Sequence, residues 1–180
     1  MQKKDGMMYA PVGKAERVCE PGEFPIAAVG LDHGHIYGMC NGLIEAGANL
    51  RWVWDPDPAK VKAFQNAYGQ VKRASEKQQI LDDKSIRLVA SASVPAKRCE
   101  LGLEVLEHHK DYFVDKAPLI SLDQLQAARE KVAATRRKYA VYYSERLHTE
   151  SSVYAGYLIE QGAIGRVLQV IGIGPHRLNV

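Results

Sequence analysis

Short apolar runs alternate along this chain with longer segments of helical spacing, and this alternation constrains the fold more than any other feature. The first run, Phe24-Pro-Ile-Ala-Ala-Val-Gly30, ends at a glycine, as a buried parallel strand often does. Ser121-Leu-Asp-Gln124 has the pattern of a capping box and marks a helix start. Further strands are predicted at 50–54, 86–90, 111–114, 139–143 and 167–173, and helices at 35–46, 59–68, 76–81, 96–109, 122–138 and 151–161.

Strands that alternate with helices form crossover connections, and these connections build a parallel sheet with helices on both faces. We therefore predict an α/β fold with a doubly wound parallel sheet of the Rossmann type. Ligands of such sheets bind outside the carboxyl ends of the strands, near the point where the strand order reverses. The residues that directly follow each strand are thus where binding or catalytic groups are expected.

Composition excludes several classes of protein. The 24 Lys and Arg residues are interleaved with 21 Asp and Glu residues, which argues against a nucleic-acid-binding face. Three scattered cysteines predict neither a disulfide framework nor a cysteine zinc site, and they favour the reducing cytoplasm. No apolar run approaches the roughly 18 residues of a membrane span. Residues 1–24 are polar and broken by glycine and proline, and are expected to form an extended leader.

The turn after the first strand, Val29-Gly-Leu-Asp-His-Gly-His-Ile-Tyr-Gly38, is the first candidate site. A dinucleotide fold needs glycine here, because amides at the helix start approach the diphosphate. Asp32 and His35 occupy the second and third glycine positions of that motif. Asp32 either points away from a diphosphate or serves as the N-cap of a structural helix. The cofactor-binding residues predicted in this turn are Gly30, His33, Gly34, His35 and Ile36.

Asp55 ends the second strand 25 residues after Gly30, where a carboxylate accepts hydrogen bonds from the adenosine ribose of a bound dinucleotide. The same charge repels a 2′-phosphate, so NAD is expected rather than NADP. The alternative is that Asp55 only opens the turn Asp55-Pro-Asp-Pro58. We expect no metal site, because His33 and His35 are two residues apart and lack third and fourth ligands nearby in the sequence.

Lys116 follows the strand 111–114 and is placed to donate a hydrogen bond to a substrate hydroxyl or carbonyl oxygen. Taken together, the series Ala28-Val-Gly-Leu-Asp-His-Gly-His, Val53-Trp-Asp-Pro-Asp-Pro, Val114-Asp-Lys-Ala-Pro and Gly162-Ala-Ile-Gly-Arg-Val resembles the Gfo/Idh/MocA oxidoreductase family. Lys116 matches the lysine of that family's Glu-Lys-Pro motif, with Asp115 in place of Glu and Ala117 inserted before the proline.

The resemblance implies an NAD(P)-binding Rossmann domain at 25–148, followed at 149–180 by a linker helix and the first strand of a substrate and oligomerisation domain. It implies hydride transfer at a hydroxyl carbon of a small molecule such as a sugar or cyclitol. It gives Lys116 catalytic and cofactor-binding roles, makes Ser91 and Ser93 cofactor-binding residues with Ser93 on the nicotinamide side, and puts Arg98 near the position of a family histidine. Glu145 and Arg146 either point at substrate or form a surface ion pair.

Two readings of the function follow. The first is the nucleotide-binding part of an NAD(P)-dependent dehydrogenase, since family members are about twice this length and their catalytic histidine or aspartate lies beyond residue 180. The second is a catalytically inactive Rossmann module kept for nucleotide binding or regulation. The predicted strand 167–173 has no partner strand within the chain, so we expect it to pair with a second copy in a homo-oligomer or to fray past Gly165.

Overall fold

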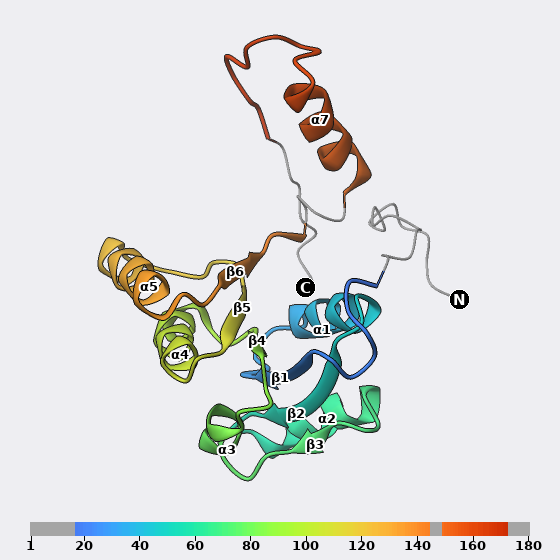
Figure 1. Cartoon of the computed structure of the whole chain (residues 1–180), viewed down its shortest axis with the longest axis vertical. Coiled ribbons are helices and arrows are strands. Elements are labelled where there is room, and N and C mark those ends of the chain that lie inside the picture. The colour runs from blue at the N-terminus through green and yellow to red at the C-terminus, as the bar shows by residue number, and fades with distance from the viewer. Residues whose placement is uncertain (1–16, 145–148, 173–180) are drawn as a thin grey trace, which may run out of the picture. The chain divides into compact units, whose positions relative to one another are not determined.

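The computed structural model describes residues 17–144 and 149–172. These residues fall into two units, one that ends at Tyr143 and one that holds Ser144 and residues 149–172. The first unit contains the whole sheet (Figure 1). Of the predicted leader, residues 1–16 lie outside the described part of the chain. Residues 17–24 lie beside the end of the first helix, where the Val18 amide donates to the carbonyl of Ala46 at 2.9 Å.

The sheet has six parallel strands in the order β3-β2-β1-β4-β5-β6. All neighbouring pairs run parallel. The direction in which the strand numbers increase reverses between β1 and β4. β1 is buried along nearly its whole length because helices cover both of its sides, and this explains its unbroken apolar run. The strands are β1 (Pro25–Val29), β2 (Asn49–Trp54), β3 (Lys72–Arg73), β4 (Leu88–Ser91), β5 (Asp111–Asp115) and β6 (Tyr139–Tyr142).

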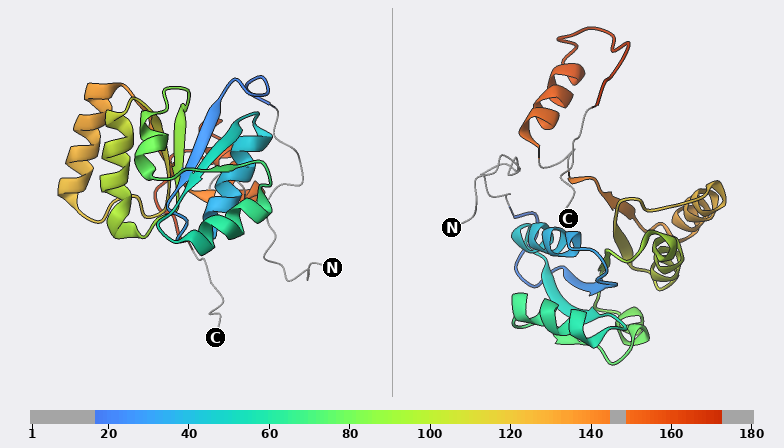
Figure 2. Two further views of the ribbon diagram at one scale, coloured as in Figure 1. Left: turned by 90° about the horizontal axis from the view of Figure 1, so that it is seen from below. Right: turned by 180° about the vertical axis from the view of Figure 1, so that it is seen from behind.

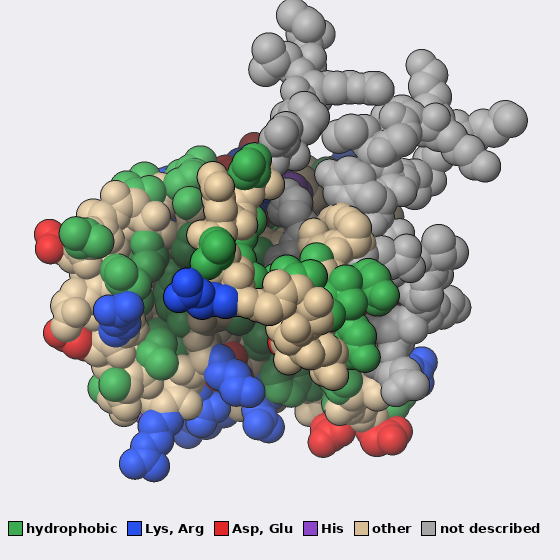
Figure 3. Space-filling model, turned by 90° about the horizontal axis from the view of Figure 1, so that it is seen from above, with side chains coloured by type: hydrophobic (Ala, Val, Ile, Leu, Met, Phe, Trp, Pro, Cys, Tyr) green, Lys and Arg blue, Asp and Glu red, His purple; other side chains and the backbone are tan. Residues whose placement is uncertain are grey.

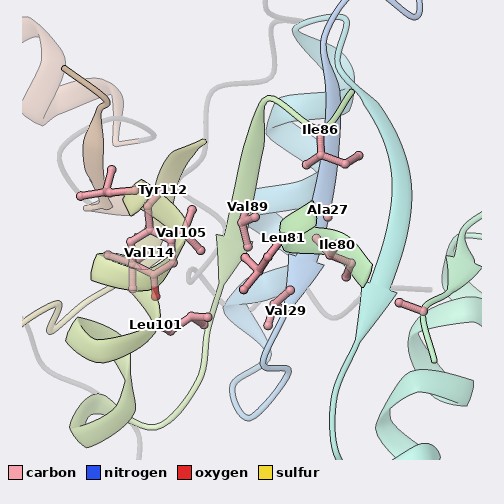
Figure 4. Close-up of a cluster of buried hydrophobic side chains, with 12 residues drawn as sticks. Ala27, Val29, Ile80, Leu81, Ile86, Val89, Leu101, Val105, Tyr112 and Val114 are labelled. Carbon is pink, nitrogen blue, oxygen red and sulfur yellow. The ribbon is translucent and has the colours of Figure 1, made fainter. Parts of the chain in front are cut away.

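Helices cover both faces of this sheet, and the prediction of a doubly wound α/β fold is confirmed (Figure 2). The helices of the chain are α1 (His35–Glu45), α2 (Pro58–Ala67), α3 (Lys77–Asp82), α4 (Pro95–Glu107), α5 (Leu122–Thr135) and α7 (Glu150–Glu160). Ala28 of β1 faces a core built with α1 and α2. Its neighbour Ala27 faces the opposite core, which includes side chains of α3 and α4 (Figure 4).

Local signals set the ends of several helices. Asp57 accepts a hydrogen bond from the Ala59 amide at 2.8 Å, and Pro58 occupies the first turn of α2. Ser121 accepts from the Gln124 amide, as predicted, but the Gln124 side chain bonds the amide of Ile120 rather than that of Ser121. α5 ends at Thr135, earlier than predicted, because Arg136 adopts a left-handed conformation with φ of 55°.

The second unit contains α7, which lies where the helix 151–161 was predicted. Residues 167–172 form neither helix nor strand, so the prediction of a strand at 167–173 is wrong for the described part of that range. A strand needs a neighbour for its backbone groups, and the described residues of this unit provide none. Ile173, Glu145 and Arg146 lie outside the described residues. Within the described residues, no helix combines the length and apolarity needed to cross a membrane.

Candidate functional site

The loop after β1 turns sharply at Gly30, where φ is +77°. The Gly30 amide donates to the Trp54 carbonyl at 3.1 Å, and its own carbonyl accepts from Ala92 at 3.0 Å. A Cβ at this position would lie 2.8 Å from the Cβ of Ser93. The loop therefore needs glycine for two reasons, the left-handed backbone and the close approach of the β4–α4 connection.

Asp32 does not cap α1, which corrects one of the two readings of this residue. The N-cap position of α1 belongs to Gly34, and no side chain caps the helix. The Asp32 carboxylate instead accepts hydrogen bonds from the Val94 amide at 3.0 Å and from the Lys60 ammonium. The hydrogen bond from Lys60 lowers the pKa of Asp32. Asp32 thus links the glycine loop to the start of α4, and its charge is paired.

Asp55 is buried, with 4% of its surface exposed, at the carboxyl end of β2. One carboxylate oxygen accepts from the Leu31 amide at 2.7 Å, and the other accepts from the Asp57 amide at 2.9 Å. The sequence predicts Asp55 to be a ribose ligand or a turn residue. The structure shows that Asp55 also holds the glycine loop in place through the Leu31 amide. Each of its oxygens keeps a second lone pair for a further donor.

A cavity of about 320 Å³ opens beside these residues. It is bounded by the ends of β1 and β2, the first turns of α4 and the start of α3. Four acidic side chains and two lysines line it, and two of the carboxylates are paired, Asp32 with Lys60 and Glu104 with Lys77. The lining residues are Val29, Gly30, Asp32, Trp54, Asp55, Pro56, Lys77, Ser93, Lys97, Glu100, Leu101 and Glu104.

Ser91 and Ser93 lie under the glycine loop at the end of β4, and both are buried. Their hydroxyl oxygens are 3.3 Å apart, and the Ser91 hydroxyl is positioned against Gly30. Ile36, predicted to contact the cofactor, has its side chain in the hydrophobic core, and its amide donates to the His33 carbonyl at 3.2 Å. The side chain of Ile36 is therefore structural.

The Asp115 carboxylate, at the end of β5, lies close to three polar side chains, and no sequence pattern predicted these contacts. The carboxylate lies 2.9 Å from Nδ1 of His35 and 3.5 Å from Nδ1 of His33. The oxygen that lies nearer to His33 also accepts a hydrogen bond from Nη2 of Arg98 at 3.1 Å. No third ligand stands near the two histidines in the sequence, but the fold places Asp115 beside both.

Arg98 is a buried side chain, and the sequence indicates only that it lies near the position of a family histidine. Besides Asp115, its guanidinium donates to the carbonyls of Ser93 at 2.6 Å and Ala117 at 3.2 Å. It therefore joins the loops after β4 and β5. Sequence signals for this role were weak, since a single arginine on the first turns of a helix is usually exposed.

Lys116 follows Asp115 at the edge of the sheet and is half-buried. Its amide donates to the Asp115 carboxylate at 2.8 Å, and the cis peptide bond of this turn joins Lys116 to Ala117 rather than preceding Pro118. The sheet thus brings the glycine loop, Ser93 and Lys116 to the same carboxyl edge, with Asp55 one strand further along.

Comparison with known proteins shows which family has this arrangement. The model of an oxidoreductase family with an NAD-binding Rossmann fold matches residues 28–144. A protein from Erwinia carotovora atroseptica SCRI1043, assigned as an oxidoreductase, is 44% identical with a TM-score of 0.83, over 87% of this chain and 47% of its own. A comparison with curated proteins gave no match.

Two more distant structures share the fold. An oxidoreductase from Agrobacterium radiobacter, in complex with NAD+, L-tartaric acid and magnesium, is 20% identical with a TM-score of 0.70, over 80% of this chain and 42% of its own. A protein from Sinorhizobium meliloti 1021, assigned as a myo-inositol dehydrogenase, is 22% identical with a TM-score of 0.69, over 79% and 42%. The chain spans about half the length of these proteins. On the strength of the family match and the 44% identity, this chain belongs to the Gfo/Idh/MocA oxidoreductase family, whose members carry an NAD-binding Rossmann fold.

Proposed function

We propose that this chain binds NAD(H) and forms the nucleotide-binding part of an oxidoreductase that transfers a hydride at a hydroxyl carbon of a small molecule, such as a sugar or cyclitol. The observation that carries the proposal is the glycine loop at the point where the strand order reverses. Gly30 makes the turn, and α1 begins directly behind it with its amides at the carboxyl edge of the sheet.

The start of α1 fits a diphosphate. Gly34 is exposed, and a Cβ at this position would meet no protein atom within 4 Å. None of the described residues accepts a hydrogen bond from the Gly34 amide. An anion beside this helix start would gain an unsatisfied amide and the positive end of the helix dipole. Because Asp32 is turned to Lys60 and Val94, its replacement of glycine does not oppose such an anion.

The cavity beside Asp55 fits the adenosine half of the cofactor. Its walls combine the apolar surfaces of Val29, Trp54 and Leu101 with the Asp55 carboxylate, which can accept from ribose hydroxyls. Glu100 adds a second negative charge beside Asp55, so a 2′-phosphate would be repelled, whereas the Glu104 carboxylate is paired with Lys77. These features favour NAD over NADP.

The nicotinamide and substrate would lie near Ser93 and Lys116. When bound, the nicotinamide supplies or accepts the hydride. Lys116, at the end of β5, is the chain's own candidate to donate a hydrogen bond to the substrate oxygen and stabilise negative charge there. Ser93 supports the loop that faces this position, and Arg98 holds the loops of β4 and β5 together.

We also propose a homo-oligomer in the cytoplasm, with a small-molecule substrate and without nucleic acid. Exposed apolar side chains of the second unit, including Tyr154, Leu168 and Val170, suit an interface with a second copy. The described cysteines are all free thiols, which suits a reducing compartment. On the face in Figure 3, several Lys and Arg side chains lie along the lower edge, and hydrophobic and other side chains make up most of the rest, so this view shows no continuous basic surface.

Titration with NADH tests the dinucleotide site. Trp54 lines the cavity, so bound NADH is expected to accept excitation energy from it. Gly34→Ala should weaken NADH binding about tenfold, or ~1.4 kcal/mol, because the added methyl group lies where the diphosphate approaches. Gly42→Ala is the matched control, since its Cβ also meets no atom within 4 Å but lies inside α1.

Equal NADH affinities of the Gly34→Ala variant and the wild type would contradict the proposed placement of the diphosphate. Absence of NADH binding to the wild-type chain would contradict the nucleotide-binding function itself. NADPH should bind more weakly than NADH, and the reverse order would contradict the role given to Asp55. Tight NADH binding without turnover in a chain extended to the length of its relatives would favour the regulatory module.

A further inference from the structure

Three potential metal ligands meet at the carboxyl ends of β1 and β5, and two of them belong to the turn that was predicted to bind the cofactor. His33 and His35 come from the glycine loop and the start of α1, and Asp115 comes from β5. One ligand atom of each lies within 4.8 Å of the others. The two imidazole rings pack edge to face, with 4.1 Å between their centroids. Residues 80 positions apart in the chain thus form one compact cluster.

The spacing of these atoms suits a single bound ion. Ligands that surround zinc tetrahedrally at about 2.0–2.1 Å are about 3.3 Å from one another. In the structure Nδ1 of His35 lies 2.9 Å from one Asp115 oxygen, and Nδ1 of His33 lies 3.5 Å from the other. The two distances bracket this value, but they run to different carboxylate oxygens, so the side chains must shift for all three residues to bind one ion.

The contacts of His33 set a condition for cation binding. Its Nδ1 accepts a hydrogen bond from the His35 amide at 3.2 Å and lies 3.5 Å from an Asp115 oxygen. An imidazole nitrogen carries either a proton or a lone pair, so it cannot accept from the amide and donate to the carboxylate together. While it accepts, its one lone pair is directed at the amide, so Nδ1 of His33 can bind an ion only after it releases this 3.2 Å hydrogen bond.

The carboxylate is held in place from behind. Nη2 of Arg98 donates to one Asp115 oxygen at 3.1 Å, and the Lys116 amide donates to the other at 2.8 Å. Because a carboxylate has about four lone-pair directions, these two donors leave those toward the histidines, and Nδ1 of His35 lies 2.9 Å along one of them. Hydrogen-bonded carboxylates of this kind are typical of metal centres, where the outer partners orient the ligand.

We propose that His33, His35 and Asp115 form a binding site for a divalent transition-metal ion of the zinc class, with one coordination position open to an oxygen ligand. Two imidazoles and a carboxylate are the donors that zinc and cobalt accept, whereas magnesium and calcium prefer oxygen ligands alone. The Asp115 side chain is only 2% exposed, but that of His33 is 54% exposed. The open position therefore faces solvent, and water or an oxygen of a small molecule can fill it.

Titration of the metal-free chain with Co²⁺ tests the site. We expect one ion per chain and visible absorption of the intensity typical of four-coordinate cobalt. Zn²⁺ should displace the Co²⁺ and raise the melting temperature of the chain. His33→Gln and His35→Gln should each weaken Co²⁺ binding at least about tenfold, because each removes one of three ligands. His108→Gln is the control, since His108 lies on a different part of the molecule beside Asp82.

Asp115 is left unchanged in this test, because its loss would leave the buried Arg98 without an anionic partner and affect folding. The proposal is overturned if the folded wild-type chain binds no Co²⁺, or if the two histidine variants bind it as tightly as the wild type and His108→Gln. NADH affinity, measured separately without metal, reports on the nucleotide site, so the two proposals can fail independently.

Discussion

Gly30→Ala is the substitution whose cost the structure specifies in most detail. The new side chain would sit on a backbone with φ of +77°, which costs an L-residue about 1–2 kcal/mol. Its Cβ would also lie 2.8 Å from the Cβ of Ser93 and 3.4 Å from its Cα. Overpacking of this kind costs about 1–3 kcal/mol. We therefore expect the free energy of unfolding to fall by about 2–5 kcal/mol.

A double-mutant cycle with Ser93→Gly separates the two costs. Removal of the Ser93 side chain deletes the atom at 2.8 Å but leaves the left-handed backbone, so the cycle should show about 1–3 kcal/mol of favourable coupling. Urea unfolding followed by tryptophan fluorescence measures this, because Trp52 and Trp54 both lie in β2. Gly69→Ala, whose Cβ meets nothing within 4 Å, is the control. A cost below about 1 kcal/mol for Gly30→Ala, or no coupling, would refute the reasoning.

Two further predictions concern ionisable groups. The pKa of Asp32 is lowered, chiefly by its hydrogen bond from Lys60, so its contribution to stability is complete above the unfolded pKa of about 4 and is lost as the pH falls through the lower folded value. The stability difference between the wild type and Asp32→Asn, measured in urea, should hence be smaller at pH 3 than at pH 7, and an unchanged difference would contradict this ion pair. Burial raises the pKa of Cys40 to about 12, and Cys99 is also buried, so a thiol reagent at pH 8 should modify only the half-exposed Cys19 until the chain is unfolded. Rapid modification of Cys40 or Cys99 in the native chain would contradict this prediction, because it would show that the reagent reaches a buried thiol.

The fold could be predicted because apolar spacing records burial directly. The run that became β1 is apolar because helices cover both of its sides, and the helices show their buried stripes in the same way. β3 was missed because Lys72 and Arg73 are exposed and carry no apolar pattern, and pairing with β2 alone makes them a strand. Residues 167–172 show the opposite case, in which strand propensity without a neighbouring strand produces no strand.

The site was only partly predictable. Some of its residues are determined by the sequence next to them, whereas others depend on contacts between strands that are distant in the sequence. Gly30 could be identified since a tight turn after a strand requires glycine within a few residues. The second role of Asp55, which holds the Leu31 amide, depends on the pairing of β1 with β2. The contacts of Arg98 with Asp115 depend on β4 and β5 being neighbours, which no local pattern records.

The carboxylates at this edge of the sheet explain how the glycine loop is held before any ligand binds. Asp55 fixes its first turn through the Leu31 amide, and Asp32 ties its middle to Val94 at the start of α4. Asp115 contacts the imidazole of His35 at its far end. A loop anchored at each end and in the middle loses little conformational freedom when an anion or metal ion binds, so less of the binding energy is spent on ordering. From the sequence, Asp32 and Asp55 would be expected to repel an anionic cofactor. Their contacts are with backbone amides and a lysine of this chain, so in this structure they mainly hold the loop in place.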